Sequence, residues 1–113
     1  MGETMEDRID MAYTLSELGI ASVPINTLIP IPGTPLENLP VLTPNEILRT
    51  IAIFRFICPE SNIRLGAGRK LIPGNGKTAF LGGASATITG NMLTTSGSTI
   101  SSDIRMLSEM GRL

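Results

Sequence analysis

The feature that most constrains the fold of this chain is a regular alternation of helix-like and strand-like segments. Seven segments follow one another in the order helix, strand, helix, strand, helix, strand, helix. The predicted helices cover residues 4–19, 43–58, 78–84 and 100–111, and the predicted strands cover residues 20–26, 62–68 and 85–90. Strict alternation predicts parallel strands joined by right-handed crossovers, with helices covering the sheet. The predicted fold class is therefore α/β.

A parallel sheet of only three strands is small, and it exposes two apolar edges. Three strand–helix units are also a fraction of the eight that form a (β/α)8 barrel. The pattern therefore predicts a fragment of a larger domain.

Capping residues mark where the predicted helices begin. Thr4 and Asp7 have the spacing of a capping box. Thr43 and Pro44 stand at the cap and first position of the second helix, with Glu46 at box spacing. The apolar stripes expected on the helices are Met5, Ile9, Ala12, Leu15 and Leu18 in the first, Ile47, Ile51 and Phe54 in the second, and Ile100, Ile104, Leu107 and Met110 in the last.

The connections between these elements are rich in proline and glycine. Residues 27–42 carry four prolines and one glycine, which predicts an extended, stiff loop. "GAGRK" and "IPGNGKTAF" resemble phosphate-binding loops, but they lack glycines that those motifs require, so we interpret both as turns. The hydroxyl-rich residues 94–99 are interpreted as a loop that caps the last helix.

Composition excludes several classes of function. The formal net charge is -1 and the basic residues are dispersed among acids, so a nucleic-acid surface is not expected. The chain has no histidine and one cysteine, Cys58, which excludes an internal disulfide and most zinc or histidine-based sites. We predict that Cys58 packs in the core. No apolar run is long enough to span a membrane and no signal peptide is evident, so a cytoplasmic location is expected.

Strand alternation places two polar side chains on the face that points into a barrel. The residues predicted to face the helices are Val23, Ile25, Ile63 and Leu65. Asn26 and Arg64 then point inward near the carboxyl ends of their strands, where barrel enzymes place functional groups. An asparagine there either hydrogen-bonds a neighbouring loop or contacts a ligand. An arginine there is either a member of a structural ion pair or a partner of an anionic or metal-bound group.

Several motifs, in order, resemble one family. The stretches "SVPINTLIPIPGTPLENLP", "LTPNEILRTIAIFRFICPESNIRLGAGRK" and "FLGGASATITGNMLTTSGSTISSDIRMLSEMG" are similar to the C-terminal half of the biotin synthases, including their BATS region. The opening "GET" also resembles the end of a glycine-rich loop in this family of radical S-adenosylmethionine enzymes. The resemblance covers nearly the whole chain and implies that residues 1–113 form a single partial domain, the C-terminal segment of a (β/α)8 TIM-type barrel.

The resemblance also implies a chemistry. In the family, a [4Fe-4S] cluster held by a C-x-x-x-C-x-x-C motif cleaves S-adenosylmethionine, and the resulting radical abstracts hydrogen from dethiobiotin. A [2Fe-2S] cluster, held by three cysteines and one arginine, supplies the sulfur that forms biotin. The family arginine falls on Arg64, and a dethiobiotin-contacting asparagine falls on Asn26. A homodimer is implied for the full-length enzyme.

The chain departs from the family pattern in two ways. It has no C-x-x-x-C-x-x-C motif and none of the family's cluster cysteines, so the N-terminal half of the barrel must supply most ligands of both clusters. Ala86 stands where many members have serine. We therefore expect the isolated chain to be inactive.

Two other hypotheses remain open at this stage. The chain is either a fragment of another radical S-adenosylmethionine enzyme, of the hydrogenase-maturation or pyrrolysine-pathway type, or a non-catalytic half-barrel assembly module. Cysteines encoded upstream would separate the first of these from a biotin synthase, and a stable cluster-free oligomer would favour the second.

Overall fold

The computed structural model describes residues 2–90 and 99–112 of the chain. In chain order, the elements are α1 (Met5–Glu17), β1 (Ser22–Ile25), α2 (Pro44–Ile57), β2 (Asn62–Leu65), the 3-10 helix η1 (Arg69–Leu71), α3 (Lys77–Gly82), β3 (Ala86–Thr87) and α4 (Ile100–Glu109). The strands are parallel and lie in the order β1-β2-β3. The predicted α/β class and the order of the elements are confirmed.

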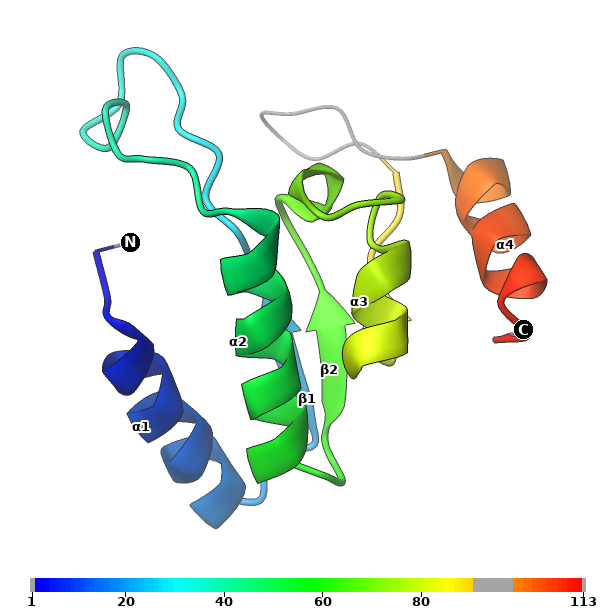
Figure 1. Cartoon of the computed structure of the whole chain (residues 1–113), viewed down its shortest axis with the longest axis horizontal. Coiled ribbons are helices and arrows are strands. Elements are labelled where there is room, and N and C mark those ends of the chain that lie inside the picture. The colour runs from blue at the N-terminus through cyan, green and yellow to red at the C-terminus, as the bar shows by residue number, and fades with distance from the viewer. Residues whose placement is uncertain (1, 91–98, 113) are drawn as a thin grey trace.

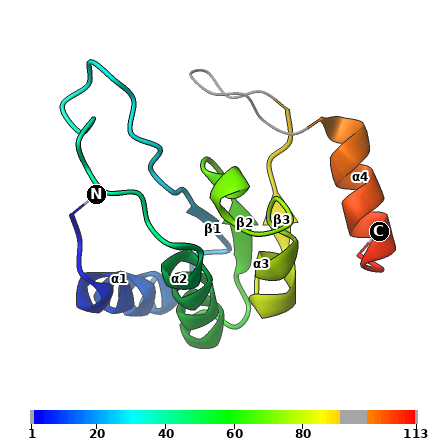
Figure 2. The same ribbon diagram turned by 45° about the horizontal axis from the view of Figure 1, so that its top comes forward.

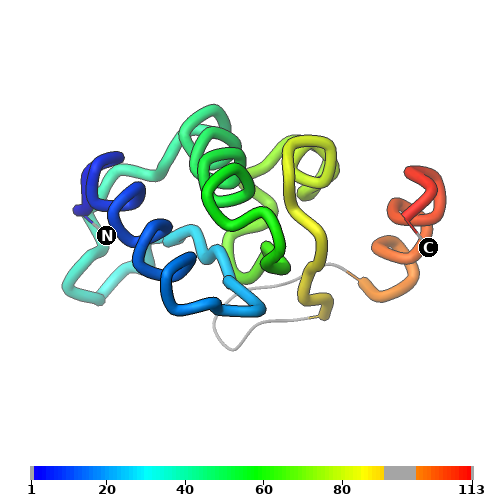
Figure 3. Tube along the Cα trace, turned by 90° about the horizontal axis from the view of Figure 1, so that it is seen from below, coloured from blue at the N-terminus to red at the C-terminus, as the bar shows by residue number. Residues whose placement is uncertain are grey.

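The helices form a layer on one face of the sheet. Figures 1 and 2 show α1, α2 and α3 beside one another over that face, whereas α4 lies beyond β3. The view from below in Figure 3 shows the same separation of α4 from the first three helices. The strands point toward the end of the molecule where the loop of residues 26–43 and η1 lie (Figure 1). Three parallel strands with flanking helices are the arrangement expected of part of a (β/α)8 barrel.

The capping signals act as the sequence predicts. The Thr4 hydroxyl accepts a hydrogen bond from the Asp7 N–H at 3.1 Å, and the Asp7 carboxylate accepts one from the Thr4 N–H at 2.8 Å. The Thr43 hydroxyl accepts from the Glu46 N–H at 3.2 Å, and Pro44 opens α2. These bonds satisfy amide donors that have no partner inside the helix.

The core lies between α2 and the sheet. Ile51 and Ile63 are completely buried, and Leu65 is 2 % exposed. The predicted stripe of α2 is buried throughout, whereas Ala12 is the buried residue of α1. Cys58 packs at the end of α2, 3 % exposed, with its thiol 3.4 Å from the Ala12 carbonyl oxygen. The predicted packing role of Cys58 is confirmed.

The hydrogen bonds of β1 explain which way its backbone faces. The carbonyls of Ala21 and Ile25 accept bonds from β2 and the residue after it, at 2.8 and 2.9 Å. The N–H and C=O groups of successive residues in a strand point in opposite directions. Those of the odd-numbered residues of β1 therefore point toward β2, and those of the even-numbered residues point toward the outer edge of the sheet. Pro24, which has no N–H, therefore lies with its nitrogen at the outer edge.

The predicted stripe of the last helix is wrong in part. Leu107 and Met110 pack against the core, but Ile100 and Ile104 are 61 % and 52 % exposed. Asp103 is the buried residue of α4. The physical reason is an ion pair, because Asp103 turns inward to meet Arg69 and the side of α4 that carries Asp103 is therefore the buried one.

The last strand and the connections are close to their predictions. β3 is shorter than predicted, although the Ser85 and Ile88 N–H groups extend its ladder to β2 with bonds of 2.9 and 3.0 Å. The loop of residues 26–43 contains only turns and irregular structure. Of the predicted capping loop, residues 94–98 lie outside the described part of the chain, while the Thr99 hydroxyl accepts from the Ser102 N–H at 3.2 Å and caps α4.

Candidate functional site

Arg64 lies on the face of the sheet opposite the helices, in the middle of the three strands. Its Cα pairs with Pro24 of β1 and with Ala86 of β3. Its Nε atom is buried and has no hydrogen-bond partner among the described residues. Pro24 and Ala86 offer no side-chain acceptor. Within that part of the chain, Arg64 forms no ion pair, so the structural ion-pair interpretation receives no support.

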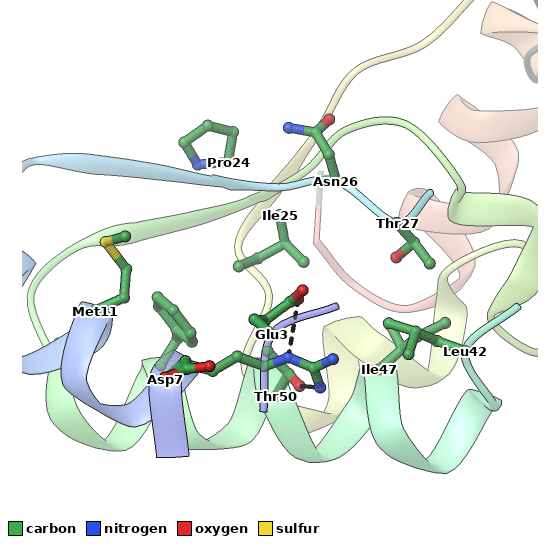
Figure 4. A pocket seen from close by; sticks show the side chains of 12 residues that line it. Glu3, Asp7, Met11, Pro24, Ile25, Asn26, Thr27, Leu42, Ile47 and Thr50 are labelled. Carbon is green, nitrogen blue, oxygen red and sulfur yellow. Dashed lines mark hydrogen bonds and ion pairs between the residues drawn. The ribbon is translucent and has the colours of Figure 1, made fainter. Parts of the chain in front are cut away.

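Asn26 follows β1 directly and is exposed. Its Oδ1 atom accepts a hydrogen bond from the Ala67 N–H at 2.8 Å. The predicted loop contact is therefore present, and it uses the carbonyl half of the side chain. Figure 4 shows that Asn26 and Pro24 point away from Ile25, which faces the helices. Asn26 thus shares the face of the sheet that carries Arg64, as strand alternation predicts.

The turn after β2 packs directly against the residues after β1. A Cβ atom built on Gly66 would lie 2.2 Å from Oδ1 of Asn26. A Cβ atom on Gly68, whose φ is +82°, would lie 2.3 Å from the Thr27 carbonyl oxygen. The Thr27 N–H donates to the Ala67 carbonyl at 2.8 Å, which locks the two segments together. The "GAG" sequence is therefore a close backbone approach, and its interpretation as a turn is confirmed.

A buried ion pair lies beyond this turn. Arg69 donates two hydrogen bonds to Asp103, from Nη1 to Oδ1 at 2.8 Å and from Nη2 to Oδ2 at 2.6 Å. Burial would raise the pKa of Asp103, but hydrogen bonds from Arg69 and Thr89 and the positive charge of Arg69 outweigh it and hold the pKa below its ordinary value. Asp103 therefore stays ionised and joins α4 to the segments that follow β2 and β3.

Sequence reasoning missed this pair, although a signal was present. Asp103 stands three residues after Ile100 and four before Leu107, so it falls within the apolar stripe predicted for the helix. An acid at such a position requires a buried basic partner. The partner, Arg69, is 34 residues away and cannot be identified from spacing.

A second arginine missed by sequence reasoning organises the other end of the sheet. Arg55 donates to the carbonyl oxygens of Gly83 and Ser61 at 2.9 and 2.7 Å. It also donates to the Pro59 carbonyl at 3.0 Å and to the Ser85 hydroxyl at 3.3 Å. These bonds join the end of α2 to the segments before β2 and β3.

A cavity of about 320 Å³ lies between α1, β1 and α2. Figure 4 shows its lining, with Ile25, Ile47 and Thr50 around the Glu3 and Asp7 side chains. Arg8 lies within this cavity, donating to Thr50 at 3.1 Å and to Glu3 at 3.2 Å. Most of the cavity is on the helix side of the sheet and Arg64 does not line it, although Pro24 and Asn26 border it at the edge of β1.

The described residues contain no group of three or more cysteines, histidines or acids that could hold a metal ion. They also contain no helix long and apolar enough to cross a membrane.

Residues 24–112 match the family model described as "Biotin and Thiamin Synthesis associated domain". The chain is 61% identical over 111 residues to the biotin synthase of Alkaliphilus metalliredigens, covering 98% of the chain and 35% of that relative. It is 56% identical to the biotin synthase of Clostridium tetani and 55% identical to that of Brachyspira hyodysenteriae, again over 98% of the chain and 34% and 33% of those relatives. The chain thus spans about a third of the length of the curated relatives it matches.

Proposed function

The chain belongs to the Biotin and Thiamin Synthesis associated domain family, and from this premise we propose that it is the C-terminal part of a biotin synthase. The complete enzyme would insert sulfur into dethiobiotin to form biotin by radical S-adenosylmethionine chemistry. The observation that carries the proposal is the 61% identity over 98% of the chain, and it is supported by the buried Nε of Arg64, which has no hydrogen-bond partner among the described residues.

Residues 1–113 would form one partial domain that completes a barrel with an N-terminal half. The three parallel strands support this proposal, because their order and the helices on one face match the strand–helix units of a barrel. The N-terminal half would supply the remaining strands, the [4Fe-4S] cluster and the S-adenosylmethionine site.

Arg64 would be a ligand of the [2Fe-2S] cluster, which supplies sulfur to the substrate when bound. The environment of Arg64 fits that role, because its buried Nε has no acceptor among the described residues and its cross-strand neighbour Ala86 carries only a methyl side chain. The thiolates that complete the site would come from the N-terminal half. An arginine held without a carboxylate partner keeps its nitrogen atoms available to another group.

Asn26 would contact dethiobiotin through its amide nitrogen. Since Oδ1 accepts from the Ala67 N–H, one of its two lone pairs is used, whereas both N–H donors of the side chain have no partner among the described residues. Dethiobiotin carries hydrogen-bond acceptors of the matching kind, a ureido carbonyl and a carboxylate. The contact with Ala67 therefore fixes the orientation of Asn26 and leaves its N–H donors for an acceptor on the ligand.

The two other hypotheses receive no support from the relatives found, which carry the name biotin synthase. The isolated chain is expected to be inactive, because most cluster ligands lie elsewhere. Reconstituting it anaerobically with iron and sulfide should give no cluster absorbance, and the appearance of that absorbance would contradict this expectation.

Complementation of a biotin auxotroph tests the proposal. We would replace the 111 matched residues of the Alkaliphilus biotin synthase with those of this chain, and the product is called the chimera below. The chimera and the unmodified relative should both support growth without biotin, whereas the isolated chain should not. A soluble chimera that fails to support growth beside a working relative would overturn the proposal.

A further inference from the structure

We propose that Asp103 is a positioning residue for Arg64, because it holds the carboxyl end of β2, which carries Arg64, and the carboxyl end of the neighbouring strand β3. The inference rests on the proposed role of Arg64 as a cluster ligand. We call Asp103, Arg69 and Thr89 the Asp103 cluster.

The contacts of Asp103 join α4 to the segments that follow two strands, β2 and β3. Asp103 is 4 % exposed, and its carboxylate accepts both bonds from Arg69, at 2.8 and 2.6 Å. Thr89 supplies a further hydrogen bond to the same carboxylate. Arg69 opens η1 shortly after β2, and Thr89 follows β3. One side chain thus holds the segments that leave both strands.

Few residues separate the Asp103 cluster from Arg64 on the β2 side. A Cβ atom on Gly76 would meet the Arg69 side chain at 2.9 Å and the Leu65 side chain at 3.0 Å, so both border the same space. Leu65 is the residue after Arg64. The intervening "GAG" turn is held against Asn26 and Thr27 and leaves little freedom. A displacement of Arg69 is therefore transmitted to the end of β2.

The separation is equally small on the β3 side. Ala86 is the Cα partner of Arg64, and Thr89 follows it by three residues. Asp103 therefore fixes the backbone of Arg64 on β2 and, on β3, the residues beside Arg64.

The energetics favour positioning over plain stabilisation. A buried ion pair costs desolvation that its attraction barely repays, and apolar residues of similar volume often serve stability as well or better. Here the pair also leaves Ile100 and Ile104 largely exposed. The need for a fixed geometry at the ends of β2 and β3 would explain why the charged Asp103 stands in the apolar stripe of α4.

A double-mutant cycle in the chimera tests this inference. The four proteins are the unsubstituted chimera, Asp103→Asn, Arg64→Ala and the double variant, each reconstituted anaerobically with iron and sulfide. The measurement is the rate at which a chelator bleaches the visible absorption of the [2Fe-2S] cluster. Asp103→Asn should speed this loss roughly three- to tenfold when Arg64 is present, which lies within the range expected for coupled residues, and have little effect when Arg64 is absent. Glu109→Gln, an exposed acid on the same helix, is the control and should change nothing.

The outcomes separate the two proposals. If Arg64→Ala leaves cluster loss unchanged, the proposed role of Arg64 fails. If Arg64→Ala speeds the loss but Asp103→Asn does not, or if their effects are independent, only the positioning role fails. Should Asp103→Asn not fold, Thr89→Val keeps the Arg69 pair and removes one contact. It should speed cluster loss in the same direction, and an unchanged rate would overturn the proposal.

Discussion

Replacing Gly68 with alanine should destabilise the fold far more than the same change at Gly33. Both residues have a left-handed backbone, with φ of +82° and +84°. Alanine in that conformation costs about 1–2 kcal/mol at either position. At Gly33 the new Cβ meets nothing within 4 Å, whereas at Gly68 it lies 2.3 Å from the Thr27 carbonyl oxygen. The pair therefore separates backbone strain from close approach.

The additional cost at Gly68 follows from what must move. The Thr27 backbone has to shift, which weakens the 2.8 Å bond from its N–H to the Ala67 carbonyl. Thr27 is 5 % exposed, so a lost bond there is not replaced by water. A buried group left without its hydrogen bond costs about 1–3 kcal/mol, which brings the total at Gly68 to roughly 2–5 kcal/mol.

Urea unfolding of the cluster-free chimera, followed by circular dichroism, measures both variants. The midpoint should fall modestly for Gly33→Ala and by at least twice as much for Gly68→Ala, with similar slopes. Equal shifts would refute the idea that the turn after β2 is pressed against the residues after β1.

Three further predictions use the same chimera. Gly66→Ala should displace the Asn26 side chain and weaken dethiobiotin binding by about tenfold, the effect of a lost hydrogen bond, and unchanged affinity in a calorimetric titration would contradict it. Arg55→Met should lower the free energy of unfolding by about 3 kcal/mol, because at least two part-buried carbonyls lose charged donors, and a loss below about 1 kcal/mol would count against this network. The pKa of Asp103 is lower in the folded state, so the stability gained from Arg69 is complete above the ordinary pKa of 3.8 and is lost as pH falls through the lower folded pKa. The stability difference from Asp103→Asn should therefore be constant above about pH 5 and shrink in acid, and a constant difference at every pH would refute it.

The elements that the sequence predicts well are those fixed by local chemistry. The box of Thr4 and Asp7 and the cap of Thr43 act over three residues, and their hydrogen bonds form as expected. Alternation along β1 and β2 likewise places Asn26 and Arg64 on the face away from the helices. Each of these features depends on neighbours in the chain.

The features that escape prediction join distant segments. Arg69 and Asp103 are 34 residues apart, and Arg55 reaches carbonyls up to 28 residues away. The apolar stripe of α4 is misjudged for the same reason, because the ion pair decides which side of that helix turns inward. Spacing along a chain carries no information about which charge meets which across a fold.

The proline in β1 has a consequence for how the parts of the barrel fit together. Since Pro24 lies with its nitrogen at the outer edge, a strand that docks there receives no amide hydrogen from the middle of β1. That seam is weaker by about one backbone hydrogen bond, or 0.5–1.5 kcal/mol, than a seam without proline. The missing N–H of Pro24 also makes pairing of this exposed edge with a second copy of the chain less favourable before the adjacent strand of the barrel docks there.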